Sequence, residues 1–155
     1  MMTRAIQNKS PGNEIVQRDV QIETKAVDEA SRSVDLSFSS EDAYERYFGP
    51  EILGHSPGEV ELGRLQAIGV ALWNHHSDIP IGRLSEIRLD ESTRKCRAKV
   101  TFDDDPESDR IFRKVKSGTL RGVSVGYRVN VWEEVKAGKT STCGRHTGPC
   151  WIARK

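Results

Sequence analysis

The sequence lacks a strong charge of one sign, and this excludes one class of partner. Its 155 residues carry 24 Lys and Arg against 23 Asp and Glu, for a formal net charge of +1. Proteins that bind nucleic acid mainly through phosphate contacts show a clear basic excess, so we expect no nucleic-acid partner. With 35% hydrophobic and 30% charged residues, the chain is polar for a globular domain but is not disordered throughout.

Long apolar runs and an even set of cysteines are also missing. The longest apolar candidate, residues 67–73, is far shorter than the roughly 18–20 residues that span a bilayer. The first residues are polar, unlike a signal peptide. Three cysteines in a chain without an export signal do not favour a disulfide framework. We therefore expect no membrane partner and a reducing intracellular compartment.

Alternating polar and apolar residues predict a mainly β (α+β) domain. The pattern predicts an antiparallel hairpin over 18–39, a short helix that begins at Ser39 and ends by Gly49, and a loop over 51–64. The later elements are expected as strands at 68–72, 79–89 and about 95–102, a helix over 105–117, and a long strand over 120–135. With mostly short connections, these elements favour a largely antiparallel sheet or barrel with one or two packed helices.

The helix over 105–117 has the clearest end signals in the sequence. Asp105 is suited to cap its first turn, and Pro106 fits the first helical position. Gly118 is a natural terminator because it adopts a left-handed conformation without strain.

Ser124 is a candidate nucleophile. It lies in the middle of the strand over 120–135, on the face opposite the apolar residues, and Gly126 beside it leaves room for a substrate backbone. A serine hydroxyl needs a base that titrates near neutral pH, and histidine is the usual choice. An ordinary serine on the solvent face of an amphipathic strand has the same pattern, so this alternative stays open.

His75 and His76 are the candidate bases among the four histidines of the chain. The pair follows a predicted strand, so the two side chains point in opposite directions and only one faces a given site. A surface or structural role for both is the alternative. The preceding Asn74 invites comparison with His-Asn-His nuclease metal sites, but a second metal-binding histidine on a helix and a basic footprint are both missing.

Cys143, His146 and Cys150 have a spacing that resembles part of a zinc knuckle. They supply three ligands, whereas a structural zinc site takes four. Cys96 completes the set only if the fold brings it close. A Gly- and Thr-rich loop with incidental Cys and His residues is the alternative.

Three stretches, taken together, resemble the prohead protease family of tailed bacteriophages, serine proteases that mature the procapsid and are related to herpesvirus assemblins. The family shows Asn-His-Asp followed by hydrophobic-Gly-Arg, and later a Gly-x-Ser-hydrophobic-Gly-aromatic strand. The matching stretches are residues 71–75 followed by 81–84, residues 109–120, and residues 121–129. Their order and spacing match over roughly residues 18–135.

The resemblance implies an assemblin-like, mostly antiparallel β-barrel with one or two packed helices and a serine endopeptidase that needs no metal or organic cofactor. By position, His75 corresponds to the family's catalytic base and Ser124 to its nucleophile. His76 stands in place of the family's common Asp.

The third member of the triad is not assigned. Family members usually have an acid in the strand after the histidine, but Lys99 and Thr101 stand there in this chain. Asp103 and Glu86 are the candidates that would orient His75 and stabilise its imidazolium.

The resemblance also sets expectations for domains and partners. It implies a protease domain over residues 16–135. The polar residues 1–15, with Pro11 and Gly12, predict a flexible arm, and the Gly-, Lys- and Thr-rich residues 136–155 predict a loop-rich segment. By the resemblance, this last segment stops short of the family's closing apolar strand. The expected substrates are phage scaffold and major capsid proteins, inside the assembling procapsid in the host bacterial cytoplasm, and relatives often form homo-oligomers.

Two alternative functions stay open. The first is a non-catalytic capsid-assembly or scaffold-binding module with the same fold, which does not need a nucleophile at Ser124. The second is a small zinc- or nucleic-acid-binding protein that uses Cys143, His146 and Cys150, and it predicts stoichiometric zinc.

Overall fold

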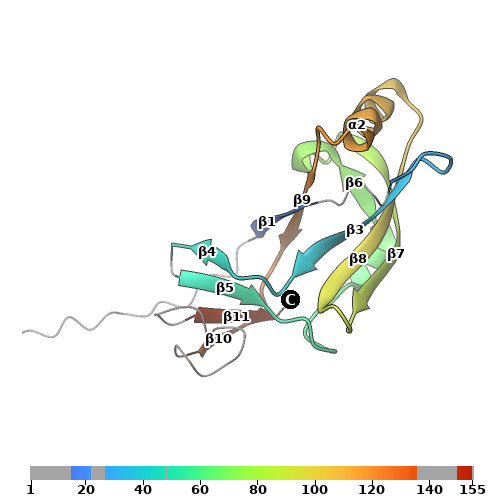
Figure 1. The fold of residues 1–155 in the computed structure, drawn as a ribbon. Helices are drawn as coiled ribbons and strands as arrows, with labels where there is room; N and C mark the ends of the chain where they lie inside the picture. The colour runs from blue at the N-terminus through green and yellow to red at the C-terminus, as the bar shows by residue number, and fades with distance from the viewer. Residues whose placement is uncertain (1–14, 22–26, 48, 136–149, 155) are drawn as a thin grey trace, which may run out of the picture.

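The structure, a computed structural model, describes residues 15–21, 27–47, 49–135 and 150–154, and it is mainly β, as the sequence predicts (Figure 1). In chain order, the elements are β1 (Val16–Gln21), β2 (Val27–Asp28), β3 (Ser33–Ser40), β4 (Tyr44–Arg46), β5 (Gly49–Leu53), α1 (Gly63–Ile68), β6 (Val70–Leu72), the 3-10 turn η2 (Trp73–His75), β7 (Pro80–Asp90), β8 (Lys95–Phe102), α2 (Pro106–Lys116), β9 (Gly122–Tyr127), β10 (Val131–Val135) and β11 (Cys150–Arg154). Among the described residues, no helix has the length and apolar character that crossing a bilayer requires.

The largest sheet has five antiparallel strands in the order β2-β3-β8-β7-β6. Every second residue of β8 is buried, which matches the period of two that a strand with one core-facing side must have. Cross-strand pairs such as Leu36 with Ala98 bring β3 and β8 together on the core side. The buried core of this sheet consists of Val34, Leu36, Phe38, Ile81, Cys96, Ala98, Val100 and Phe102, joined by three residues of α2.

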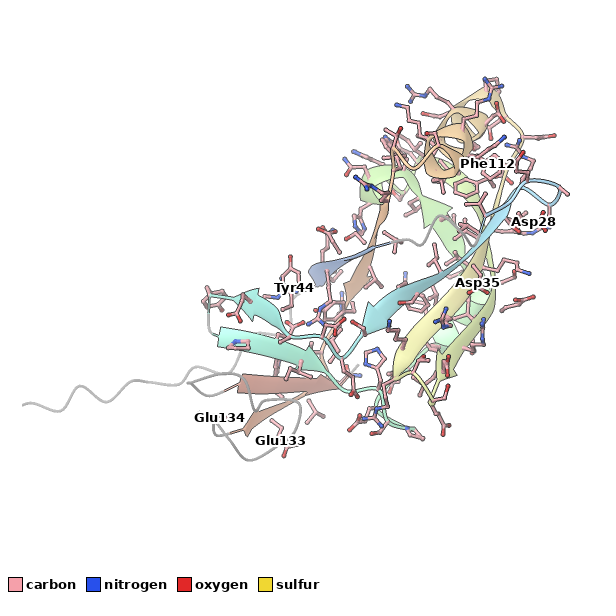
Figure 2. The ribbon with its side chains drawn as sticks, viewed as in Figure 1. Asp28, Asp35, Tyr44, Phe112, Glu133 and Glu134 are labelled. Atoms are coloured by element: carbon pink, nitrogen blue, oxygen red, sulfur yellow. The ribbon has the colours of Figure 1, made fainter. Side chains whose placement is uncertain are left out.

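Helix α2 packs its apolar stripe onto this core, and its ends are those predicted. The carboxylate of Asp105 accepts hydrogen bonds from the backbone N–H groups of Glu107 and Ser108 at 3.1 and 3.0 Å. Gly118 follows the last turn with φ +79°, where a glycine avoids the strain that a side chain brings. Phe112 lies between α2 and the strands below it (Figure 2), and its ring centroid is 5.3 Å from that of Phe102.

Two smaller sheets complete the structure. A two-stranded antiparallel ribbon of β1 and β9 lies between the five-stranded sheet and a four-stranded sheet of order β10-β11-β5-β4 (Figure 1). In the four-stranded sheet, β11 pairs antiparallel with β10 and parallel with β5. The ladders of the described residues form three separate sheets, and closure into a barrel stays a prediction.

Two predictions near the N-terminal end are wrong. The hairpin over 18–39 does not form, because β1 pairs with β9 whereas β3 pairs with β2 and β8. Alternation predicts a strand but does not identify its partner. The helix expected from Ser39 is absent: Ser39 and Ser40 are buried at the end of β3, and the Ser40 hydroxyl donates to Asp42 Oδ2 at 2.8 Å in the turn that follows.

The segment predicted as a loop over 51–64 contains most of β5 and the start of α1. The strand expected at 68–72 begins only at Val70, because Ile68 still belongs to α1. Val70 and Leu72 are exposed, since β6 is short and lies at the edge of its sheet. The strands predicted at 79–89 and 95–102 are confirmed as β7 and β8.

The long strand predicted over 120–135 divides into β9 and β10. Residues 128–130 interrupt the ladder, and the interruption reverses the side-chain alternation. Val131 is therefore 50% exposed, whereas Trp132 packs against the smaller core cluster of Leu53, Tyr127 and Val129.

Candidate active site

Ser124 lies on the middle of β9 and is half-buried. The antiparallel register with β1 places Asp19 directly opposite it. Its neighbours Val123 and Val125 pack against the main core cluster. Because successive side chains of a strand point to opposite faces, the Ser124 hydroxyl lies on the side of β9 that faces away from this core.

The two glycines on the same face as Ser124 leave that face open. An added Cβ at Gly122 would meet no heavy atom within 4 Å, and at Gly126 the nearest is Ile15 Cγ2 at 3.7 Å. Neither glycine has a positive φ, so backbone conformation does not demand a glycine at either position. The strip around Ser124 therefore has space for an extended chain to approach the hydroxyl.

His75 lies in a tight turn between β6 and β7, and its ring is exposed. The backbone N–H of His76 donates to Trp73 O at 2.9 Å, and that of Trp73 donates to Ile79 O at 3.0 Å, which closes the turn. Asn74 and His75 both have positive φ values, +49° and +61°. Consecutive non-glycine residues in this region are uncommon, and such strain clusters at functional sites. His76 is also exposed.

The two candidate catalytic residues are attached to one core. Ala71 and Trp73, just before His75, pack against the same cluster as the two valines that flank Ser124. Within the described part of the chain, no hydrogen bond joins the His75 ring and the Ser124 hydroxyl. Such bonds are often long or poorly aligned in a free enzyme and shorten when substrate binds.

The two candidate acids lie at different distances along the sheet from His75. The N–H of Asp103 donates to Ile81 O at 3.0 Å, at the start of β7, into which the His75 turn leads. Glu86 lies further along β7, at a bulge, and its Oε1 is 3.4 Å from Lys99 Nζ. Both carboxylates are exposed. The structure thus brings Asp103, and not Glu86, to the end of the sheet that carries His75.

The predicted zinc ligands fall mostly outside the described residues. Cys143 and His146 lie there, and Cys150 is described only by its backbone, as the first residue of β11. Cys96 is fully buried in the main core on β8. No group of three metal-ligating side chains occurs within the described ranges, and zinc binding by the C-terminal residues stays a prediction.

Four polar side chains that the sequence did not predict as a cluster meet between the β1–β9 ribbon and the strands β4 and β5. They are Arg18, Arg46, Glu51 and Tyr127, and we call them the Glu51 cluster. Glu51 is fully buried on β5, and its Oε1 accepts from Arg18 Nη2 at 2.9 Å and from the Tyr127 hydroxyl. Its Oε2 accepts from Arg46 Nε at 3.1 Å. Burial, together with the Glu51 carboxylate, raises the pKa of Tyr127 to about 12, so the phenol stays a donor.

The sequence offers little that would have identified this cluster. Glu51 falls in a segment read as a loop, and nothing marks its carboxylate as buried. Tyr127 carries the one usable signal: it occupies an apolar position of a strand, and a buried tyrosine hydroxyl needs a partner.

A Ser–His hydrogen bond does occur in the described structure, but between Ser39 and His55. His55 Nδ1 is 2.8 Å from Leu53 O, and its Nε2 is 3.0 Å from Ser39 Oγ. Since Nδ1 must donate to a carbonyl, Nε2 accepts from the serine hydroxyl. Both residues are fully buried, so this pair does not meet a substrate and serves the packed interior.

Comparison with known proteins supports the resemblance seen in the sequence. A family model described as caudovirus prohead serine protease matches residues 20–146. The chain is 35% identical over 95 residues to a protein named major capsid protein of Halomonas phage phiHAP-1, covering 59% of this chain and 16% of that protein. It is 28% identical over 69 residues to a capsid polyprotein of Pseudomonas phage PAJU2, covering 41% of this chain and 10% of that protein.

The matched segments are thus a small part of each of these curated relatives. No solved structure matches the chain. The family match extends over most of the sequence and contains both the His75 turn and the open strand face of Ser124. The chain therefore belongs to the caudovirus prohead serine protease family.

Proposed function

We propose that this chain is a serine endopeptidase that cuts phage capsid and scaffold proteins during procapsid maturation, with Ser124 as the nucleophile and His75 as the general base. The observation that carries the proposal is the family match over residues 20–146, which includes both residues. Two structural features support it: the bare glycine strip beside Ser124 and the strained, exposed turn of His75.

The proposed reaction follows the general logic of serine hydrolases. His75 takes the proton of the Ser124 hydroxyl as its oxygen attacks the scissile carbonyl, and backbone N–H groups stabilise the oxyanion. The protonated imidazole then gives that proton to the leaving amine, and an acyl-enzyme forms. Water, deprotonated by His75, hydrolyses the ester and restores the serine. No metal or organic cofactor is part of this scheme.

The names of the relatives support a capsid substrate. Both are capsid proteins by name, and the segment similar to this chain is only 16% and 10% of their respective lengths. A protease-like segment and a capsid protein therefore share one polypeptide in these relatives. We extend this association to the present chain, with the assembling procapsid in the host bacterial cytoplasm as its place of action.

A covalent trap tests the proposal. The purified chain is incubated with a fluorophosphonate probe, and wild type is compared with Ser124→Ala and His75→Ala by intact mass. A single adduct on wild type is expected, absent from Ser124→Ala and strongly reduced in His75→Ala.

Matched controls come from neighbouring positions. Ser85→Ala removes another half-buried strand serine, and His76→Ala removes the adjacent exposed histidine. Both should label like wild type. A folded wild-type protein that takes up no adduct, or labelling that persists in Ser124→Ala, would rule out Ser124 as the nucleophile.

The second candidate function is a non-catalytic capsid-assembly module. It is favoured by the capsid names of both relatives and by the lack of a hydrogen bond between His75 and Ser124 in the described structure. This function predicts that Ser124→Ala binds capsid or scaffold protein as wild type does. It also predicts that neither wild type nor the variant cleaves the bound protein.

A further inference from the structure

The β1–β9 ribbon carries the proposed nucleophile, yet its described ladder joins neither larger sheet. A two-stranded ribbon alone is marginally stable at best in water, so side-chain contacts must hold it in place. On one side, Val123 and Val125 pack against the main core. Apolar burial is non-directional, and it leaves the position of β9 along its own axis to be fixed by other contacts.

The polar contacts of the ribbon converge on Glu51. Its Oε1 accepts from Arg18 on β1, at 2.9 Å, and from the hydroxyl of Tyr127 on β9. Arg18 also donates to the backbone carbonyls of Ser40 and Asp42 at 3.3 and 2.8 Å. One buried carboxylate thus ties both strands of the ribbon to β5, and Arg18 ties them to the end of β3.

Arg46 on β4 completes the attachment. Its Nη2 donates to the Tyr127 hydroxyl at 3.1 Å and to the carbonyl of Gln17 at 2.8 Å, while its Nε binds Glu51 Oε2. Charge-assisted hydrogen bonds of this kind are directional. They hold Tyr127 at one position relative to β4 and β5, and Tyr127 belongs to the same six-residue strand as Ser124.

We propose that Glu51 is a positioning residue for Ser124: through Tyr127 and Arg18 it fixes the axial position of β9, and so places the serine hydroxyl relative to its base. This inference rests on the proposed function. It is chemically consequential because a displacement of about 1 Å at a reacting group can cost roughly 100-fold in rate.

Tyr127→Phe is the sharpest test, since it removes only the hydroxyl that β9 gives to the cluster. Tyr44→Phe is the matched control. The Tyr44 ring lies between β4 and β1 (Figure 2), with the guanidinium carbons of Arg46 and Arg18 at 4.4 and 5.3 Å from its centroid. Its hydroxyl makes no hydrogen bond within the described residues, so its loss leaves the polar attachment intact. Glu51→Gln and Glu51→Ala form a second pair, in which only Gln keeps an acceptor for Tyr127.

The first measurement is catalytic. For Tyr127→Phe we expect kcat on a capsid-derived peptide to fall about 10- to 100-fold with KM within about twofold, because the nucleophile is displaced and substrate contacts are kept. The shape of the pH–rate profile should not change. Glu51→Gln should retain more activity than Glu51→Ala. A lower melting temperature with unchanged kcat per folded molecule would overturn the proposal and leave Glu51 a purely structural residue.

The second measurement does not depend on activity. Amide hydrogen exchange, followed by mass spectrometry, should become faster in residues 15–21 and 122–127 of Tyr127→Phe but not in 95–102, and should not change in Tyr44→Phe. If wild type is not labelled at Ser124, the proposed function fails and positioning of a nucleophile fails with it, while exchange still decides whether Glu51 anchors the ribbon. If exchange in Tyr127→Phe is the same as in wild type, the cluster does not anchor the ribbon, and the inference is overturned even when wild type is fully active.

Discussion

The backbone N–H of Asp103 donates to the carbonyl oxygen of Ile81 at 3.0 Å and so fixes the end of β8 against the start of β7. Asp103 thereby lies at the end of the five-stranded sheet that carries the His75 turn. Glu86 lies further along β7 and is engaged by Lys99. The structure therefore distinguishes Asp103 from Glu86, which the sequence alone did not rank as candidates for the third member of the triad.

We therefore predict different effects for the two acids. Asp103→Asn should lower kcat/KM of the proposed protease by at least about tenfold, because an orienting carboxylate stabilises the imidazolium that forms on His75. Glu86→Gln, the matched control, should change it less than about twofold. Steady-state cleavage of one peptide by both variants makes the comparison. Equal activity of Asp103→Asn and wild type would remove Asp103 as the third member.

The open strip on β9 predicts a steric effect. Gly122→Val places a branched side chain on the face of Ser124, where a Cβ meets no atom within 4 Å. The melting temperature should hardly change, because valine suits a strand, while peptide cleavage should weaken mainly through KM. Gly63→Ala, at another open position outside β9, is the control. Undiminished cleavage by Gly122→Val would show that substrate does not use this strip.

Gly82, the glycine of the hydrophobic-Gly-Arg motif, has a packing role that the structure explains. An added Cβ would lie 2.4 Å from Thr101 O and 3.0 Å from Phe102 Cα, both backbone atoms of β8. Gly82→Ala should therefore lower the free energy of unfolding by about 3 kcal/mol, as overpacking does. Gly122→Ala should change it by less than about 0.5 kcal/mol. Urea titration followed by circular dichroism measures both, and similar stabilities would contradict the close approach.

The pKa of Tyr127, raised to about 12, predicts a loss of stability in alkali. The raised value means that the folded state holds the phenol proton more tightly than the unfolded state, whose tyrosine titrates near 10. The tighter hold on this proton contributes on the order of 2–3 kcal/mol to the free energy of unfolding. That contribution is fully present below about pH 10 and disappears as the pH rises towards 12. Unfolding free energies of wild type and Tyr127→Phe between pH 8 and 12 test this. Tyr127→Phe should be less stable than wild type at pH 8, and its free energy of unfolding should fall less steeply as the pH rises. If the free energies of the two proteins fell in parallel with pH, the raised pKa of Tyr127 would be contradicted.

Local signals in the sequence predicted the elements whose ends are set by neighbouring residues. Asp105, Pro106 and Gly118 delimit α2 as expected, and the alternation over 95–102 is β8. Such features depend on capping bonds and side-chain period, which act over a few residues.

Features set by distant partners were not predictable in the same way. The alternation in β1 is real, but its partner is β9, far along the chain. The burial of Glu51 depends on two arginines and a tyrosine from three other strands. At the candidate site, the resemblance named His75 and Ser124, while the strain at His75 and the sheet position of Asp103 emerged only in three dimensions.

The place of β11 in the middle of the four-stranded sheet affects the order in which the protein folds. Ile52 of β5 pairs with Ile152 of β11, so this sheet needs residues that lie far apart in the sequence. The five-stranded sheet needs only residues 27–102. Contacts between residues distant in sequence form slowly, so the five-stranded sheet should form early, both on the ribosome and on refolding. The polypeptide would then pass through a stage in which β5, paired with β4 on one side, has an unpaired edge on the other side until residues 150–154 pair with it.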